Sequence, residues 1–278
     1  MNHIFETTLV VCVVLFGVWV LGLYIVQDWM IFPRHRAKDR VGDLEREGVE
    51  LMWHETSEGN VPAWFLKGRD ADTSGGCGVV VLLHGNGNVI DDYLELAQEI
   101  VKLGPSVLLP EYRGYGHAEG RPSQKKLVDD VVGFIDQVQR RKDVIAKDIV
   151  VYGRSIGSAV AAQVALKVDL KGMILHTAPT SIACYSWRYG APPFLIRHPF
   201  RTDHALAKMR AIPILMIPHH EDALVPMHHS HVLKDIAPHA RVVELHGGHS
   251  TFRTREDRAG FKKAVSDFIT EYLPGPTS

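Results

Sequence analysis

Residues 150–160 read VVYGRSIGSAV, in which Gly153, Ser155 and Gly157 form the pattern Gly-x-Ser-x-Gly. An apolar, β-branched run precedes it and small residues follow, so we expect a strand to end here and a helix to begin. Small neighbours let such a turn pack tightly and expose the serine hydroxyl, while the helix N-terminus favours a developing negative charge. The pattern therefore predicts a nucleophile at Ser155. The alternative is a small-residue turn with only a packing role.

A serine hydroxyl is a poor nucleophile unless a base takes its proton. In this strand–turn–helix setting the partners follow the serine in the order acid, then histidine. Asp222 lies in a loop just after a predicted apolar strand, and His249 lies in a Gly-rich loop after the next one. Both would then reach the sheet edge at which Ser155 stands. Glu221 and His246 are the alternatives, and we expect His246 to face the packed rim of the sheet.

Acyl-transfer chemistry also needs two backbone N–H groups that bind the negatively charged oxygen. One is expected from Ile156, the residue after the nucleophile. The other is expected from the loop in LLHGNGNV, where Asn86 follows His84 and Gly85. The alternative for this second loop is a plain Gly/Asn turn.

Strands and helices alternate along the chain after about residue 45. We predict strands at 49–55, 61–67, 79–83, 106–110, 149–152, 172–176, 212–217 and 241–245. We predict helices at 91–103, 123–141, 156–166, 229–236 and 256–272. Short links between such elements indicate a mostly parallel sheet flanked by helices, which makes residues 33–278 one α/β domain. The long aromatic-rich segment 177–203 interrupts the alternation, and we expect it to be a lid.

The N-terminus carries no charged residue from Thr7 to Gln27. A helix needs about 20 apolar residues to cross a bilayer, so we predict a single-pass membrane anchor in residues 1–32. A cleaved signal peptide is one alternative, but no Lys or Arg precedes the run. A buried core helix is the other, but such helices are seldom apolar on all sides at this length. Aromatic residues at Tyr24, Trp29 and Phe32 are expected at the membrane interface.

Basic residues follow the apolar run at Arg34, Arg36, Lys38 and Arg40. Because positive charge is retained on the cytoplasmic side of a membrane, we expect the catalytic domain in the cytoplasm.

The composition excludes several other classes of protein. The net charge is −1, so nothing indicates binding to nucleic acid. The three cysteines have no CxxC spacing, which argues against a disulfide framework or a zinc knuckle. Histidines crowd the region around residues 219–231, but no HExxH pattern occurs, so a metal site is the weaker interpretation. We expect no cofactor and no metal.

Several motifs together resemble the α/β-hydrolase superfamily. They are LLHGNGN, PEYRGYGHAEGRPS, VYGRSIGSAVA, APTSI, EDALVPMHHSHVL and GGHS. The resemblance extends from about residue 30 to the end and is closest to the membrane-anchored, serine-aminopeptidase-like branch, which includes protein depalmitoylases. It implies Ser155 as nucleophile, Asp222 as acid and His249 as base, and it makes Asn86 and Ile156 the oxyanion donors. The chain departs from the family in the HGNGN loop, which is one residue shorter, and at His219-His220, where His-Gly is usual.

The resemblance implies an α/β-hydrolase fold and an acyl-enzyme mechanism. We expect hydrolysis of an ester or thioester, with a small-molecule or lipid-like acyl substrate met near a membrane. The alternatives are a serine peptidase and a catalytically silent binding protein that retains the fold.

Overall fold

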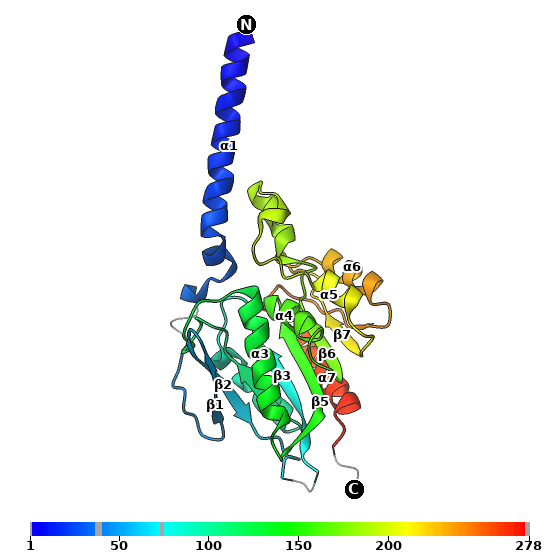
Figure 1. Ribbon diagram of the computed structural model, residues 1–278. Helices are drawn as coiled ribbons and strands as arrows, with labels where there is room; N and C mark the ends of the chain where they lie inside the picture. The colour runs from blue at the N-terminus through cyan, green and yellow to red at the C-terminus, as the bar shows by residue number, and fades with distance from the viewer. Residues whose placement is uncertain (1, 37–40, 73–74, 276–278) are drawn as a thin grey trace.

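The computed structural model describes residues 2–36, 41–72 and 75–275, and its centre is one eight-stranded sheet (Figure 1). The strands lie in the order β1-β2-β4-β3-β5-β6-β7-β8. Their bounds are Glu50–Thr56 (β1), Gly59–Leu66 (β2), Cys77–Leu83 (β3), Ser106–Pro110 (β4), Val144–Arg154 (β5), Gly172–His176 (β6), Ile214–Ile217 (β7) and Arg241–Val242 (β8). β2 pairs antiparallel with both β1 and β4, and every other pairing is parallel. The mostly parallel sheet is therefore confirmed.

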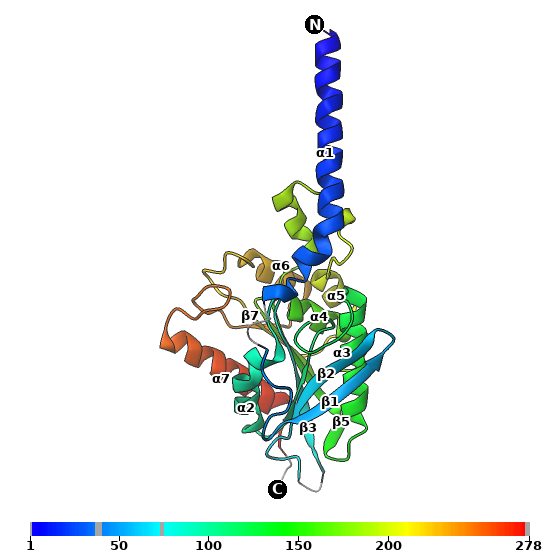
Figure 2. The same cartoon turned by 90° about the vertical axis from the view of Figure 1, so that its left-hand side faces the viewer.

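Helices cover both faces of this sheet, with α2 and α7 on one face and α3 and α4 on the other (Figure 2). Their bounds are Leu94–Val101 (α2), Gln124–Gln139 (α3), Ile156–Val164 (α4), Thr202–Lys208 (α5), His228–Ile236 (α6) and Arg255–Tyr272 (α7), and a short 3₁₀ helix, η2, covers Ile90–Tyr93. Side chains of β3 alternate between the faces: Val79 and Val81 join the apolar cluster of α3 and α4, whereas Val80 joins that of α2 and α7. This double cover explains why the central strands are apolar throughout.

The largest differences from the predicted elements concern β5, β8 and α5. β5 begins at Val144 rather than at residue 149, because Val144 pairs with Cys77 across an irregularity in the ladder. β8 stops at Val242 instead of 245, and further along the chain Leu245 forms an isolated bridge with His219. The helix α5 was not predicted at all.

The apolar N-terminal run forms one helix, α1, over Asn2–Ile31, which projects away from the domain (Figure 1). Thirty residues span about 45 Å at 1.5 Å per residue. Among the described residues, α1 is the one helix whose length and apolar composition would allow it to cross a membrane. Its side chains over most of its length are exposed in the isolated chain.

The expected aromatic belt is only partly consistent with the structure. Trp29 is 64% exposed and Tyr24 is 42% exposed, as interfacial residues would be. Phe32 is only 2% exposed, because the chain turns into the domain there and the ring packs against His198 and Phe200. The expectation for Phe32 is therefore wrong. Of the four basic residues that follow the run, Lys38 and Arg40 lie outside the described residues.

Residues 177–203, which we call the lid, rise beside the lower half of α1 (Figures 1 and 2). They contain two 3₁₀ helices, η3 over Ile182–Tyr189 and η4 over Pro193–Leu195. Thr177 and Phe200, close to the two ends of the lid, have positive φ angles of 47° and 43°. Such backbone is costly for residues with side chains, by about 1–3 kcal/mol each, so the packing around the lid must impose both bends.

Candidate active site

Ser155 occupies a sharp turn between β5 and α4, with φ 54° and ψ −119°. Its backbone N–H donates to the carbonyl of His176 at 2.9 Å, which ties the turn to the neighbouring strand. A Cβ atom on Gly153 would lie 2.2 Å from the carbonyl oxygen of Gly157, and one on Gly157 would lie 2.3 Å from that of Leu83. The flanking glycines are therefore needed because backbone segments pass too closely for any side chain.

Asp222 and His249, which lie in the loops after β7 and β8, are hydrogen-bonded to each other. His249 Nδ1 is 2.7 Å from Oδ2 of Asp222. The carboxylate only accepts, so Nδ1 carries the proton and Nε2 is left as the basic nitrogen. Burial alone would raise the pKa of Asp222, but the hydrogen bonds from His249 and from the N–H groups of Val225 and Leu224 outweigh it and lower that pKa.

The alternative residues form a separate pair at the surface. His246 Nδ1 is 3.1 Å from Oε1 of Glu221, and the other carboxylate oxygen of Glu221 accepts from the N–H of Gly247. The His246 side chain is 52% exposed, so the expectation that it faces the packed rim is wrong. Two acid–histidine pairs therefore lie side by side in the same two loops, and of the two, Asp222–His249 is the buried one.

The hydroxyl of Ser155 forms no hydrogen bond with any described residue, His249 included. Ser155 itself is only 8% exposed. The loop that carries His249 is instead held by its backbone: the Arg154 guanidinium donates to the His249 carbonyl at 2.6 Å and to the Ser250 hydroxyl at 2.7 Å. The structure thus brings Asp222 and His249 together and leaves the last hydrogen bond, from Ser155 to His249, unmade.

A chain of buried hydrogen bonds also contacts the loop that carries His249, at the carbonyl of Gly248. Tyr152 Oη lies 2.6 Å from His176 Nδ1, His176 Nε2 lies 3.1 Å from His219 Nε2, and His219 Nδ1 lies 2.9 Å from the Gly248 carbonyl. Burial lowers the pKa of both imidazoles, so each ring is neutral and carries one proton. The Gly248 carbonyl can only accept, so His219 donates to Gly248, His176 donates to His219, and Tyr152 donates to His176. Sequence reasoning missed this chain and Arg154.

The two expected oxyanion donors lie beside Ser155. Asn86 and Ile156 both line the same cavity as the serine. Neither backbone N–H donates to another described residue, and Ile156 begins α4, where such groups are free of intrahelical partners. The Asn86 side chain is held by the Tyr115 hydroxyl at 3.1 Å. Both N–H groups are therefore available to an oxygen next to Ser155.

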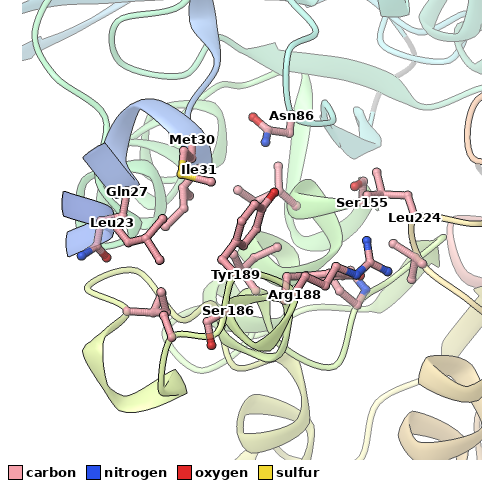
Figure 3. Close-up of a pocket in the computed structure, with 17 residues that line it drawn as sticks. Leu23, Gln27, Met30, Ile31, Asn86, Ser155, Ser186, Arg188, Tyr189 and Leu224 are labelled. Atoms are coloured by element: carbon pink, nitrogen blue, oxygen red, sulfur yellow. The ribbon is translucent and has the colours of Figure 1, made fainter. Parts of the chain in front are cut away.

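Ser155 opens onto an elongated, largely apolar cavity of about 220 Å³. Figure 3 shows Ser155 and Leu224 on one side and side chains of α1 on the other. The lid supplies most of the remaining wall. The α1 residues that line the cavity are Leu23, Gln27, Met30 and Ile31. The lid residues that line it include Ile182, Tyr185, Ser186, Arg188, Tyr189 and Ile196. The apolar composition of α1 predicts only an anchor, and the polar Gln27 at the end of the apolar run is the one local signal of this second role.

The histidine-rich region has other roles than metal binding in the part of the chain that is described. No group of three or more His, Cys, Asp or Glu residues there could hold a metal ion. His219 belongs to the buried chain, His220 pairs with Glu244, and His229 accepts from the backbone N–H of Thr180.

Comparisons with known proteins find relatives of this chain in sequence and in fold. Residues 76–210 match the family model described as serine aminopeptidase, S33. The chain is 33% identical over 229 residues to the uncharacterized protein Rv2307c of Mycobacterium tuberculosis, with 78% of each chain covered. It is 28% identical over 249 residues to the α/β hydrolase domain-containing protein WAV2 of Arabidopsis thaliana, covering 81% of this chain and 80% of WAV2. Its fold matches that of the Pyrococcus furiosus esterase Pf2001, with a TM-score of 0.67 at 17% identity, covering 84% of this chain and 97% of the esterase.

Proposed function

This chain belongs to the α/β hydrolases of the serine aminopeptidase (S33) family, and on that premise we propose that it is a serine hydrolase that cleaves an ester or thioester of an apolar acyl chain. The observation that carries the proposal is the setting of Ser155. Its hydroxyl lies on a strained turn beside an apolar cavity, and among the described residues neither this hydroxyl nor the N–H groups of Asn86 and Ile156 have a partner. The esterase named among the structural neighbours has the same fold.

The proposed reaction has two acyl-transfer steps. Ser155 Oγ attacks the carbonyl carbon while His249 Nε2 takes its proton, and the N–H groups of Asn86 and Ile156 stabilise the oxyanion. His249 then gives that proton to the departing alcohol or thiol, which leaves an acyl-serine. His249 next takes a proton from water, whose oxygen attacks the acyl-serine, and returns that proton to Ser155 Oγ as the carboxylic acid leaves. Asp222 keeps the imidazole in the required tautomer throughout.

The Ser155–His249 hydrogen bond must form for this reaction. Catalytic hydrogen bonds are often long in enzymes without substrate and shorten when it binds. His249 is attached to the domain through the Asp222 contact and through the Arg154 contact to its carbonyl. These two contacts leave Nε2 unbonded among the described residues and available to Ser155.

The residues that line the cavity favour a substrate with an apolar acyl chain over a peptide with a free α-amine. An aminopeptidase must bind an ammonium group, for which a carboxylate is the usual partner. The described residues that line this cavity include no Asp or Glu, and Arg188 is their one charged member. Aliphatic and aromatic side chains dominate the rest of the wall, which suits a hydrocarbon chain.

We also propose that α1 anchors the protein in a membrane as a single span, with the catalytic domain in the cytoplasm. The uncharged stretch from Thr7 to Gln27 matches the thickness of a bilayer core. Arg34 and Arg36 then lie on the domain side of that stretch, where basic residues favour the cytoplasm. A protease-protection assay with inverted vesicles tests this: the domain must be digested there and protected in right-side-out vesicles.

A fluorophosphonate probe separates this enzyme from a silent protein of the same fold. The probe must label the wild type and must not label Ser155→Ala. The same pair must differ in hydrolysis of p-nitrophenyl esters, with circular dichroism as the control for folding. Equal turnover in the two proteins would overturn the assignment, and absence of labelling in the wild type would favour the binding protein.

A further inference from the structure

The lid is fastened to α1 by hydrogen bonds between segments that lie more than 160 residues apart. The indole N–H of Trp19 donates to the carbonyl of Tyr189 at 2.8 Å. The Arg197 guanidinium donates to the carbonyl of Tyr24 at 2.7 Å and lies over the Tyr24 ring. These contacts fix the position of the lid relative to α1 at two levels along the helix.

Gln27 closes this attachment. Its Oε1 accepts from the N–H of Arg197 at 2.7 Å, and its Nε2 donates to the carbonyls of Tyr24 and Leu195 at 3.0 and 3.3 Å. Both polar atoms of the side chain are therefore bonded, and the residue is only 4% exposed. A glutamine on a lipid-facing helix surface would leave its amide unsatisfied, which is costly. This explains why the one polar residue at the end of the apolar run lies on the face that meets the lid.

The same face of α1 lines the cavity beside Ser155. Leu23, Gln27 and Met30 follow one another at intervals of four and three residues, which places them on one stripe of the helix. Neighbours off the stripe, such as Leu21 and Ile25, are 58% and 67% exposed. Figure 3 shows the stripe facing the cavity from the side opposite Ser155.

The height of the lid along α1 indicates where the cavity opens. Trp19 precedes Gln27 by eight residues, about 12 Å along the axis, and the half-thickness of a bilayer core is about 15 Å. The contact at Trp19 therefore lies within the hydrocarbon of the leaflet next to the domain, if the uncharged stretch spans the membrane. Trp187 and Phe194 on the lid are 66% and 83% exposed, as expected of apolar side chains that face lipid.

We propose that the stripe of α1 and the lid together form the acyl-chain binding site, and that it receives the hydrocarbon chain of a bilayer-resident ester or thioester directly from that leaflet. The anchor then determines chain-length specificity as well as location. This inference rests on the proposed hydrolase function and deepens it. Side chains of α1 satisfy the lid carbonyls of Tyr189 and Leu195 and the lid N–H of Arg197, which lowers the cost of placing these groups in hydrocarbon.

The test alters the volume of the cavity from the α1 side. Full-length protein in phosphatidylcholine vesicles is assayed with p-nitrophenyl palmitate and p-nitrophenyl acetate. Leu23→Trp fills the cavity and is expected to lower the palmitate-to-acetate ratio of kcat/KM about tenfold, whereas Leu23→Ala enlarges the cavity and is expected to raise that ratio. Leu21→Trp, on the exposed side of the same helix, is the matched control and must retain the wild-type ratio.

Fluorophosphonate labelling of each variant separates the possible failures. If every variant is labelled but Leu23→Trp and Leu23→Ala keep the wild-type ratio, the inference about α1 is overturned and the hydrolase function stands. An equal fall in the ratio for Leu21→Trp would also overturn it, because the effect would then come from the membrane insertion of α1. If the wild type itself is neither labelled nor active on acetate, the proposed function fails first.

Discussion

Arg154, the residue just before the proposed nucleophile, donates a hydrogen bond from its guanidinium to the backbone carbonyl of His249 at 2.6 Å. A second bond from the same nitrogen reaches the Ser250 hydroxyl. The variable position of the Gly-x-Ser-x-Gly pattern therefore links the turn that bears the serine to the loop that bears the histidine. This couples two parts of the site that are 94 residues apart in the sequence, since 249 − 155 = 94.

Arg154→Gln is expected to loosen the His249 loop, because a shorter side chain cannot reach both acceptors. A displacement of about 1 Å costs roughly 100-fold in rate, so we expect kcat to fall by about 10–100-fold with a smaller change in KM. Ser250→Ala removes one of the two acceptors and should have a smaller effect. Steady-state kinetics on a short-chain ester measures both, and an unchanged kcat for Arg154→Gln would show that the contact has no positioning role.

Two substitutions of Ser155 separate chemistry from backbone strain. Ser155→Ala and Ser155→Gly both remove the hydroxyl and should abolish ester turnover. Glycine adopts a positive φ of 54° without steric strain, whereas alanine does not. The free energy of unfolding of Ser155→Gly is therefore expected to exceed that of Ser155→Ala by about 1 kcal/mol. Urea unfolding of the two variants measures the difference. Equal stabilities would mean that the turn stores no strain.

The two neighbouring acid–histidine pairs allow a matched comparison of carboxylates. Asp222→Asn should lower kcat by about 10³–10⁴-fold, because an amide no longer fixes the tautomer of His249. Glu221→Gln retains an oxygen acceptor and lies in the exposed pair with His246, so its kcat should stay within about twofold of the wild type. A large loss for Glu221→Gln with little loss for Asp222→Asn would reverse the assignment of the acid.

Acid pH is expected to destabilise the fold through buried neutral histidines. Burial, with the nearby charges of His228 and Arg188, lowers the pKa of His229 to about 4, and its Nδ1 accepts from the N–H of Thr180. The unfolded chain has a histidine pKa of about 6.5, so between these values the unfolded state binds more protons. Stability is therefore full above about pH 6.5 and falls as the pH drops toward 4.

His176 and His219, whose pKa values are also lowered, act in the same direction. His229→Asn keeps an acceptor for Thr180 but removes one titrating group, so it should reduce the loss of stability between pH 7.5 and pH 5. Urea midpoints at the two pH values measure this. The same loss in the wild type and in His229→Asn would exclude His229 as a source.

Much of the fold and the proposed site could be predicted from local sequence. The apolar runs before Gly153 and Asp222 marked strands, and the small residues around Ser155 marked the turn, because these features depend on a few neighbouring residues. Local sequence does not distinguish Asp222 from Glu221 as the acid, because the two carboxylates are adjacent in the same loop. The assignment depends on which carboxylate is buried against the rest of the domain, and that is a property of packing.

The succession of strands along the chain, the turn at Ser155 and the length of the apolar helix could be predicted from local residues, since each depends on periodicity and on local backbone sterics. That α1 forms a wall of the cavity and that Gln27 meets Leu195 are consequences of tertiary packing. The same packing joins His176 and His219 in one buried chain. These contacts connect residues 43 to 168 positions apart, and no local pattern records which distant segments will share a surface.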